Sequence, residues 1–269
     1  MLATIALRLL EAWLVCAATQ AALWAIAQRT KNAAIVDVGW AASFTLVVAL
    51  YALARDTPAE LGWAPIAVVI IAWSIRLAGY LISRGAITGR EEGRYVRLRE
   101  QWGTRAPQRL FVFFQAQAAL TALLSGAFVV PFLVAPWDGG LLRGLGTLVA
   151  AAGVIGESIA DDQLARFKQY PAHAGQVCEV GQRRYSRHPN YFFEWCYWLG
   201  LAIYGVAFAP WGLIALVGQA IILGSIWGVT GIPPTENQAI RSKGEAYRSY
   251  QARVSRFIPM PPKRARPDL

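Results

Sequence analysis

Long apolar stretches alternate with short polar segments along almost the whole chain. A transmembrane helix needs about 20 mainly apolar residues to cross the hydrocarbon layer of a bilayer. Seven stretches come close to or exceed this length. The pattern therefore predicts an all-α, polytopic membrane protein with seven transmembrane helices, at residues 2–27, 33–54, 61–82, 110–135, 141–160, 191–208 and 211–232.

Positive charge is concentrated in three of the segments between and after these helices. Residues 84–109, 161–190 and 233–269 hold 20 of the 26 Lys and Arg residues. Other connections, such as 55–60 and 136–140, are short and carry little positive charge. Because loops rich in Lys and Arg stay in the cytoplasm, the N-terminus is expected outside and the C-terminus in the cytoplasm.

The composition agrees with a membrane protein. Hydrophobic residues make up 56% of the 269 residues and charged residues only 16%, whereas soluble domains carry about 25% charge. This composition excludes disordered chains and disulfide scaffolds. The net charge of +10 fits basic loops facing anionic lipid better than nucleic-acid binding. Three cysteines and two histidines show no metal-site spacing, and no second soluble domain is visible, so 1–269 is predicted as one integral membrane domain.

Beyond the first predicted span, five ionisable residues stand out in or directly at the cytoplasmic ends of the predicted spans. Ionisable groups in a bilayer are costly unless they are paired or hydrated. One interpretation is a shared polar cavity that opens to the cytoplasm; the alternative is a set of ion pairs that hold helices together. The residues are Asp37, Arg76, Glu157, Asp161 and Glu194.

The segment around 157–194 contains the most informative pattern. Helical spacing puts Glu157, Asp161 and Lys168 on one face, and Pro189 fits a helix start with Asn190 and Glu194 one turn apart. Basic side chains suit phosphates, whereas amides and carboxylates suit a carboxamide or ribose hydroxyls. This combination favours a nucleotide site over a basic loop that merely contacts anionic lipid. His173 is expected at the surface, and His188 fits a ligand contact or a structural hydrogen bond equally well.

These residues also carry a family resemblance. The string Tyr185-Ser-Arg-His-Pro-Asn-Tyr-Phe-Phe-Glu194 resembles the signature of bacterial membrane proteins in the steroid 5α-reductase superfamily. Further segments that resemble this superfamily are spread from about residue 33 to 260. The Arg-His-Pro-x-Tyr element is shared with membrane isoprenylcysteine methyltransferases. The additional pieces are Asp37-Val-Gly-Trp40, Arg76-Leu-x-Gly-Tyr80-Leu-x-x-Arg84, Gly93-Arg94-Tyr95…Arg99, Asp161-x-Gln163…Phe167-Lys168 and Glu236…Gly244-x-x-Tyr247-x-x-Tyr250…Phe257-Ile-Pro259.

The resemblance implies a seven-helix fold that binds NADPH from the cytoplasmic side of a bacterial inner membrane. Asn190 and Glu194 would meet the nicotinamide, and Asp161 with Lys168 the ribose and phosphate region. The family polarises its substrate ketone with a Glu and a Tyr; here Asp37 stands for the acid, and Trp73 or Tyr80 for the tyrosine. The full set expected to bind cofactor is Arg76, Arg84, Glu157, Asp161, Arg166, Lys168, Tyr185, Arg187, His188, Asn190, Glu194, Glu236 and Tyr247.

The expected activity is therefore NADPH-dependent transfer of hydride to the C=C bond of a 3-oxo-Δ4-steroid or a similar lipid enone. The alternative enzyme is an S-adenosylmethionine-dependent methyltransferase of the isoprenylcysteine methyltransferase type. A third interpretation is a lipid-binding or transport protein that catalyses no reaction. The expected partners are membrane lipid and the lipid-soluble substrate, with no nucleic acid, no metal and no obligatory protein partner.

Overall fold

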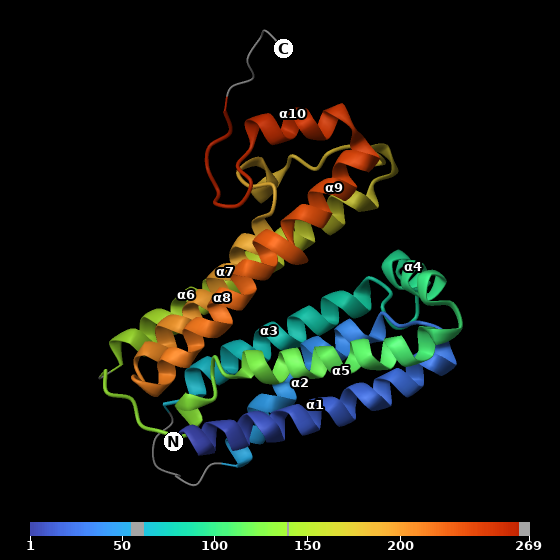
Figure 1. Cartoon of the computed structure of the whole chain (residues 1–269). Helices are drawn as coiled ribbons and strands as arrows, with labels where there is room; N and C mark the ends of the chain where they lie inside the picture. Colours follow the sequence, from blue (N-terminus) through green and yellow to red (C-terminus); the bar gives the residue numbers. More distant parts are fainter. Residues whose placement is uncertain (55–61, 139, 264–269) are drawn as a thin grey trace. The chain divides into compact units, whose positions relative to one another are not determined.

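A computed structural model describes residues 1–54, 62–138 and 140–263 (Figure 1). Over these residues the chain is all-helical and forms no strand, which confirms the predicted all-α class. The predicted connection 55–60 and the last residues, 264–269, lie outside the described part. The α-helices are α1 (Leu2–Thr30), α2 (Ile35–Leu53), α3 (Ala64–Ser83), α4 (Gly93–Trp102), α5 (Ala106–Ser125), α6 (Leu141–Gln169), α7 (Pro189–Val206), α8 (Ala215–Gly224), α9 (Ile232–Lys243) and α10 (Glu245–Arg253).

Short helical turns connect several of these helices. Five are 3-10 turns, and one, η6, is a π-helical turn between α8 and α9. The 3-10 turns are η1 (Gly103–Arg105), η2 (Val130–Phe132), η3 (Pro171–His173), η4 (Gly181–Arg184) and η5 (Trp211–Ile214), and the π-helical turn is η6 (Ser225–Val229).

Five helical segments of the described chain are long and apolar enough to cross a membrane. They are Leu2–Thr30, Ile35–Leu53, Ala64–Ser83, Leu141–Gln169 and Trp211–Lys243. The other two predicted spans, 110–135 and 191–208, do form helices, α5 and α7, but these are not among the five. The count of seven spans and the orientation of the termini stay predictions.

The chain divides into two compact units, each built from two separate stretches of sequence. Unit one contains Met1–Arg143 and Tyr204–Gly218, and unit two contains Gly144–Ile203 and Gln219–Leu269. Each unit is described below by itself.

Unit one is built around the antiparallel pair α2 and α3. The Ser74 hydroxyl donates to the carbonyl of Ala41 at 2.6 Å, and the Thr45 hydroxyl donates to Ser74 at 2.8 Å. Next to these polar contacts, the rings of Phe44 and Trp73 pack edge to face with centroids 5.1 Å apart. Paired polar groups are required here because an unpaired hydroxyl is costly to bury.

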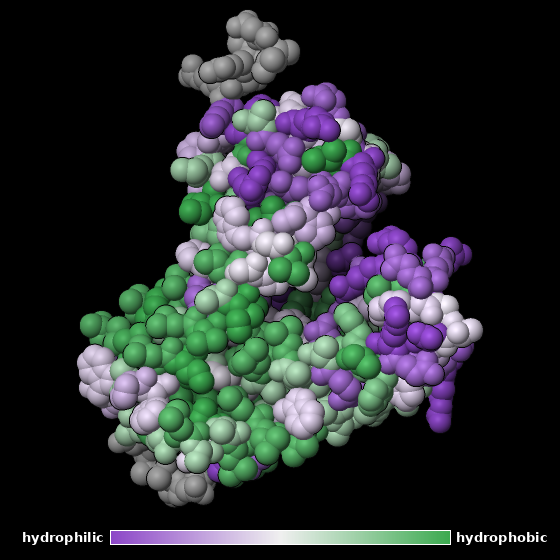
Figure 2. Space-filling view, in the orientation of Figure 1, coloured by the Kyte–Doolittle hydropathy of each residue, from purple (hydrophilic) through white to green (hydrophobic). Residues whose placement is uncertain are grey.

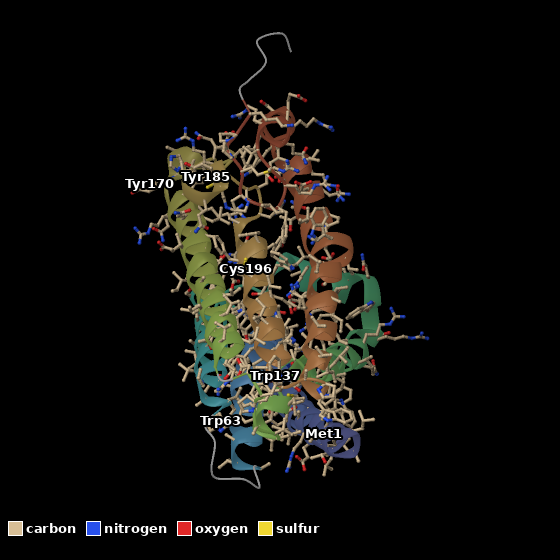
Figure 3. All side chains as sticks on the ribbon, turned by 90° about the vertical axis from the view of Figure 1, so that its left-hand side faces the viewer. Met1, Trp63, Trp137, Tyr170, Tyr185 and Cys196 are labelled. Atoms are coloured by element: carbon tan, nitrogen blue, oxygen red, sulfur yellow. The ribbon has the colours of Figure 1, made fainter. Side chains whose placement is uncertain are left out.

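One end of unit one carries exposed or half-buried tryptophans. Trp63 and Trp137 lie at the same end of this unit as Met1 (Figure 3). Trp137 is 63% exposed and its indole donates to the carbonyl of Val206 at 3.0 Å. Tryptophan at the ends of spans is typical of a membrane–water interface.

Unit two is organised by a close contact between α6 and α7. A Cβ atom placed on Gly153 would lie 2.5 Å from the backbone N of Tyr197 and 2.7 Å from the carbonyl O of Phe193. Gly156 likewise leaves no room for a side chain against the Phe193 ring, and Gly200 none against Ala150. Small residues allow membrane helices to approach until their backbones touch. We call this contact the glycine seam.

Two helices continue beyond their predicted limits in unit two. The predicted span 141–160 is the first part of α6, which runs on to Gln169. The predicted polar segment after residue 232 begins with α9 and continues with α10. Figure 2 shows hydrophilic side chains gathered over α9 and α10, and a separate hydrophilic group over α4 of unit one. A helix rises about 1.5 Å per residue. The polar residues at the end of α6 therefore extend past the apolar part of that helix.

Candidate functional site

The glycine seam places acidic residues of α6 beside the first turns of α7. Because Gly156 meets Phe193 and the two helices run antiparallel, Glu157 lies level with Phe193 and Glu194. Continuing by one turn sets Asp161 level with the start of α7, where Pro189 and Asn190 lie. Glu157 and Asp161 are only 7% and 6% exposed. The structure thus gathers four predicted site residues, Glu157, Asp161, Asn190 and Glu194, at one end of one helix pair.

Glu194 is held in place by its own helix. The indole of Trp198, one turn later, donates to Glu194 Oε1 at 2.8 Å. Trp198 has no exposed surface, so the carboxylate it binds has a defined position. Tyr197, which is also fully buried, interacts electrostatically with Glu194 and with Glu157. Two carboxylates and one phenol therefore lie at the same level along the α6–α7 pair. We call this level the seam layer.

Basic and amide groups continue from the end of α6 into the following loop. Arg166 pairs with Asp162 on the exposed side of the helix at 2.9 Å. The side chain of Gln163 accepts a hydrogen bond from the backbone N of Gln182 at 2.8 Å, which fixes η4 against α6. Within the described residues, Gln182 Oε1 and Arg183 Nε are buried without a hydrogen-bond partner. A buried acceptor and donor left open in this way can bind a polar ligand.

Three of the predicted cofactor residues instead bind one another. Arg187 Nε donates to Glu236 Oε1 at 2.7 Å, and His188 Nε2 lies 3.2 Å from the same oxygen. Gln251 donates to Glu236 Oε2 at 3.1 Å, and Arg187 Nη1 donates to the carbonyl of Val254 at 2.7 Å. All three charged or titratable side chains are less than 9% exposed. We call Arg187, His188 and Glu236 the buried triad; it connects the start of α7 to α9 and to the chain after α10.

The protonation of residues near the triad follows from burial. Burial lowers the pKa of His188, although the neighbouring Glu236 carboxylate opposes this effect. Burial also raises the pKa of Tyr247, on α10, to about 12. His188 is therefore neutral and Tyr247 protonated at neutral pH. Of the predicted tyrosines in this unit, Tyr185 is 44% exposed whereas Tyr247 is 6% exposed.

In unit one, Asp37 is the centre of a second polar cluster. It lies in the first turn of α2 and accepts hydrogen bonds from the guanidinium of Arg94 and, at 3.0 Å, from the hydroxyl of Tyr95. Arg94 Nη2 also donates to the Tyr95 hydroxyl at 2.8 Å. Burial raises the pKa of Tyr95, and Asp37 raises it further, so this phenol stays protonated. Although burial opposes the charge on Arg94, Asp37 holds the pKa of Arg94 above its usual value.

The predicted residues of α3 form a ladder along one face. The guanidinium carbons of Arg76 and Arg84 lie 5.7 and 5.6 Å from the centre of the Tyr80 ring, a distance at which cation–π attraction operates. The α2–α3 pairing sets Tyr80 near the level of Asp37. Trp73 lies two turns away and has no exposed surface, since Trp40 and Phe44 pack around it. A ligand would contact Trp73 only after these rings moved.

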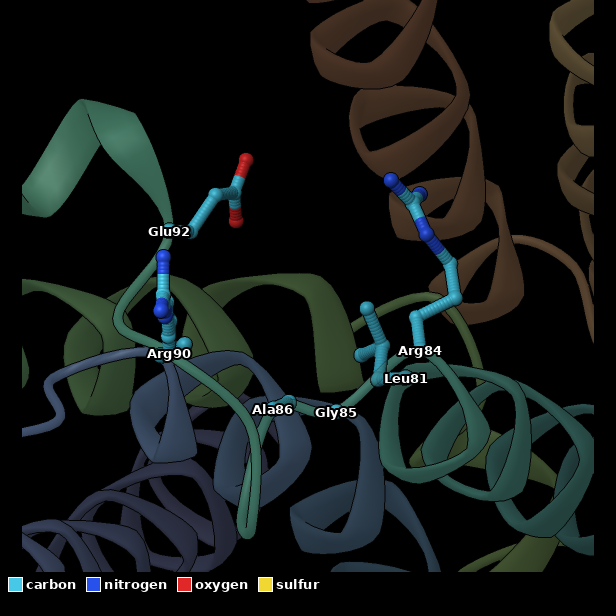
Figure 4. A pocket seen from close by; sticks show the side chains of 7 residues that line it. Leu81, Arg84, Gly85, Ala86, Arg90 and Glu92 are labelled. Atoms are coloured by element: carbon cyan, nitrogen blue, oxygen red, sulfur yellow. The ribbon is translucent and has the colours of Figure 1, made fainter.

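A cavity of about 140 Å³ opens in unit one, where α3 ends and the chain leads to α4. Ala34, Leu81 and Ala86 line it, and Arg84, Arg90 and Glu92 project into the space around it (Figure 4). Arg84 also lies over the Tyr80 ring. The cavity therefore presents two guanidinium groups and one carboxylate.

The sequence analysis missed several residues that the structure brings to these clusters. Arg94 and Tyr95 contact Asp37, and Trp198 binds Glu194. Glu91 also belongs here, because it accepts from the backbone N of Ala33 at 2.7 Å and fixes the loop before α4 to the start of α2. The motif Gly93-Arg94-Tyr95 was a signal for two of them; nothing in the sequence pointed to Glu91 or Trp198. In the residues that the structure describes, no group of His, Cys, Asp and Glu is suited to hold a metal ion.

Comparison with known proteins places the chain in a family. Residues 23–254 match the family described as "Protein of unknown function (DUF1295)". The chain belongs to this family. The family is associated with steroid 5α-reductase-like membrane proteins. No curated protein and no solved structure matches the chain.

Proposed function

We propose that this DUF1295 protein is an NADPH-dependent membrane reductase that transfers hydride to the C=C bond of a lipid enone, such as a 3-oxo-Δ4-steroid. The observation that carries the proposal is the layer at the end of the glycine seam. Buried acids from α6 lie level there with the amide and acid of α7. Ionisable residues inside a membrane are rare and mark functional sites, which favours a polar ligand as the reason for their presence.

The donor and acceptor set fits a dinucleotide. Asn190 and Glu194 are suited to accept from and donate to a carboxamide, and Asp161 to accept from ribose hydroxyls. The open Nε of Arg183 and the cation of Lys168 are suited to phosphate. The buried triad is occupied within the chain, so we assign Arg187, His188 and Glu236 the task of holding the start of α7 in position. NADPH, when bound, would supply the hydride.

The cluster around Asp37 in unit one contains groups that are suited to a ketone oxygen. A lipid enone requires a hydrogen-bond donor at its ketone oxygen, where negative charge develops during hydride addition. Asp37 Oδ2 accepts hydrogen bonds from the guanidinium of Arg94 and from the hydroxyl of Tyr95. The one hydroxyl proton of Tyr95 is already donated to Asp37. We therefore propose Tyr80 as the phenol that donates to the ketone oxygen, and we assign Asp37 the task of holding Arg94 and Tyr95 in position.

The test uses purified full-length protein in detergent with NADPH or NADH and a panel of enones. A product heavier by two hydrogens, formed with NADPH, supports the reductase. NADPH should also raise the melting temperature, because a ligand that binds only the folded state stabilises it by mass action. Stabilisation by S-adenosylmethionine and not by NADPH would support the methyltransferase alternative and contradict the reductase.

Variants connect the activity to the seam. We expect Glu194→Gln to lower turnover at least tenfold, whereas Glu245→Gln on α10, whose side chain is 89% exposed, leaves it unchanged. If both variants lose the same activity, or if neither loses activity, Glu194 does not take part in the reaction and the proposal is contradicted.

A further inference from the structure

The chain after α10 turns back along the loop that precedes α7 (Figure 1). We call residues 254–263 the tail segment. Its backbone is fixed at several points: Arg187 N donates to Ser255 O at 2.8 Å, Ser186 Oγ donates to Phe257 O at 2.7 Å, and Met260 N donates to Tyr185 O at 2.9 Å. The tail segment is therefore a fixed part of unit two.

Phe257 brings the tail segment to the depth of apolar helix residues. Its ring centre lies 5.7 Å from that of Phe192, 5.9 Å from Trp195 and 5.5 Å from Trp227. Phe192 and Trp195 are three and six residues inside α7, which is about 5 and 9 Å along the helix axis. Trp227 belongs to a helical segment that is apolar enough to cross a membrane. The tail segment thus lies level with the first turns of α7 and against the apolar segment that contains Trp227.

The outer side of the tail segment is apolar. Ile258 and Met260 are each 56% exposed, and Tyr185 beside them is 44% exposed. Trp227, under Phe257, is 45% exposed. Phe257 is buried against the protein, whereas Ile258 and Met260 are exposed on the outer side of the tail segment. Exposed apolar side chains grouped with Trp and Tyr are typical of a surface that lies in a membrane interface.

Basic side chains flank this apolar surface. The guanidinium carbon of Arg256 lies 6.0 Å from the centre of the Trp227 ring, and its Nε pairs with Glu236 Oε2 at 3.9 Å. Arg184 and Lys263 line a cavity of about 370 Å³ beside the tail segment, together with Arg253 and Glu179. Arg253 is bound to both carboxylate oxygens of Glu179 at 3.0 Å, so the charge of this pair is balanced. Arg184 and Lys263 are both exposed.

We propose that the tail segment is a lipid-docking surface, in which Ile258 and Met260 enter the bilayer interface while Arg184 and Lys263 bind the phosphates of anionic phospholipids. Charge complementarity selects this occupant, because the basic groups lie at the rim of an apolar surface and anionic headgroups lie above the acyl chains. The proposal is independent of the proposed reaction, since it requires neither a cofactor nor turnover.

The first measurement is the depth of the tail segment. Full-length protein carrying Ile258→Cys is spin-labelled and placed in nanodiscs of phosphatidylcholine with phosphatidylglycerol. Protein without an added cysteine gives the background, because Cys16 and Cys178 are buried and Cys196 is half-buried. We expect the label at 258 to collide with oxygen and to be shielded from a water-soluble nickel chelate. The same label on Arg248→Cys should show the reverse order, and equal nickel access at both positions would overturn the proposal.

The second measurement tests the headgroup. Replacing phosphatidylglycerol by phosphatidylcholine should increase the mobility of the label at 258 severalfold. Arg184→Gln with Lys263→Gln should remove this dependence on lipid. The charge-matched control, Arg241→Gln with Arg248→Gln, should keep it. A response that is the same in both double variants, or absent in the parent protein, would overturn the proposal.

Two further outcomes assign the surface to something else. Free phosphate that restores the immobile label in phosphatidylcholine nanodiscs would indicate a soluble anion and contradict a lipid headgroup. Spin–spin broadening that grows with the number of chains per nanodisc would indicate contact with a second copy and contradict lipid docking.

Discussion

The glycine seam gives the sharpest prediction of stability. Gly153→Ala would add one methyl group between α6 and α7, in contact with the backbone of α7. The added Cβ would lie 2.5 Å from Tyr197 N, 2.7 Å from Phe193 O and 2.8 Å from Tyr197 Cα. Real Cβ atoms essentially never approach closer than 3.0 Å, so the helices must separate by about 0.5 Å at this point. A backbone cannot rotate away as a flexible side chain can.

The magnitude follows from two opposing effects. Overpacking a well-packed contact costs about 1–3 kcal/mol. Replacing Gly by Ala in a helix returns about 0.5–1 kcal/mol, because Ala has less conformational freedom to lose. We expect a net loss of about 1–2 kcal/mol, which corresponds to roughly 2–8 °C in melting temperature. The same separation would move Glu157 away from Glu194, so ligand stabilisation should weaken as well.

Gly144→Ala is the matched control, because it makes the same chemical change in the same helix. No atom lies within 4 Å of a Cβ placed there. This variant should be unchanged or more stable by up to about 1 kcal/mol. Both variants are melted in the same detergent, with intrinsic tryptophan fluorescence as the signal. A melting temperature for Gly153→Ala at or above that of Gly144→Ala would refute the close approach of the two helices.

Three further predictions concern the polar clusters. Tyr95→Phe removes the hydroxyl between Asp37 and Arg94 and should cost about 1–3 kcal/mol in thermal melting, since a buried hydrogen-bonded group loses its partner. Glu236→Gln leaves the buried Arg187 charge without a carboxylate and should cost about 3–5 kcal/mol. Burial lowers the pKa of His188 below its unfolded value, so its contribution to stability is complete above about pH 6.5 and decreases as the pH falls below it; melting temperatures across this range measure it.

Each has its own control. Tyr170→Phe, at a residue 62% exposed, should leave the melting temperature unchanged, and a drop equal to that of Tyr95→Phe would contradict the first prediction. Glu245→Gln serves in the same way for Glu236→Gln. For the pH effect, His188→Gln should flatten the acid side of the curve; an undiminished slope in this variant would assign the effect to other groups.

The sequence by itself determined the helical class and several helix boundaries. Apolar runs of sufficient length have no other way to satisfy their backbone groups in a bilayer, so helices follow from composition alone. The start of α7 at Pro189 was predictable because proline fits the first helical position. The shared face of Glu157 and Asp161 followed from helical periodicity, which depends on spacing only.

Partners across helices were decided by the tertiary structure. Arg187, His188 and Glu236 were predicted as ligands of a cofactor, and the fold joins them to one another because α9 returns beside the start of α7. The sequence grouped Asp37 with four other ionisable residues but did not indicate its direct partners, Arg94 and Tyr95, which α4 supplies. A periodic pattern says which residues of one helix share a face. It does not say which distant helix meets that face, because this depends on packing between segments far apart along the chain.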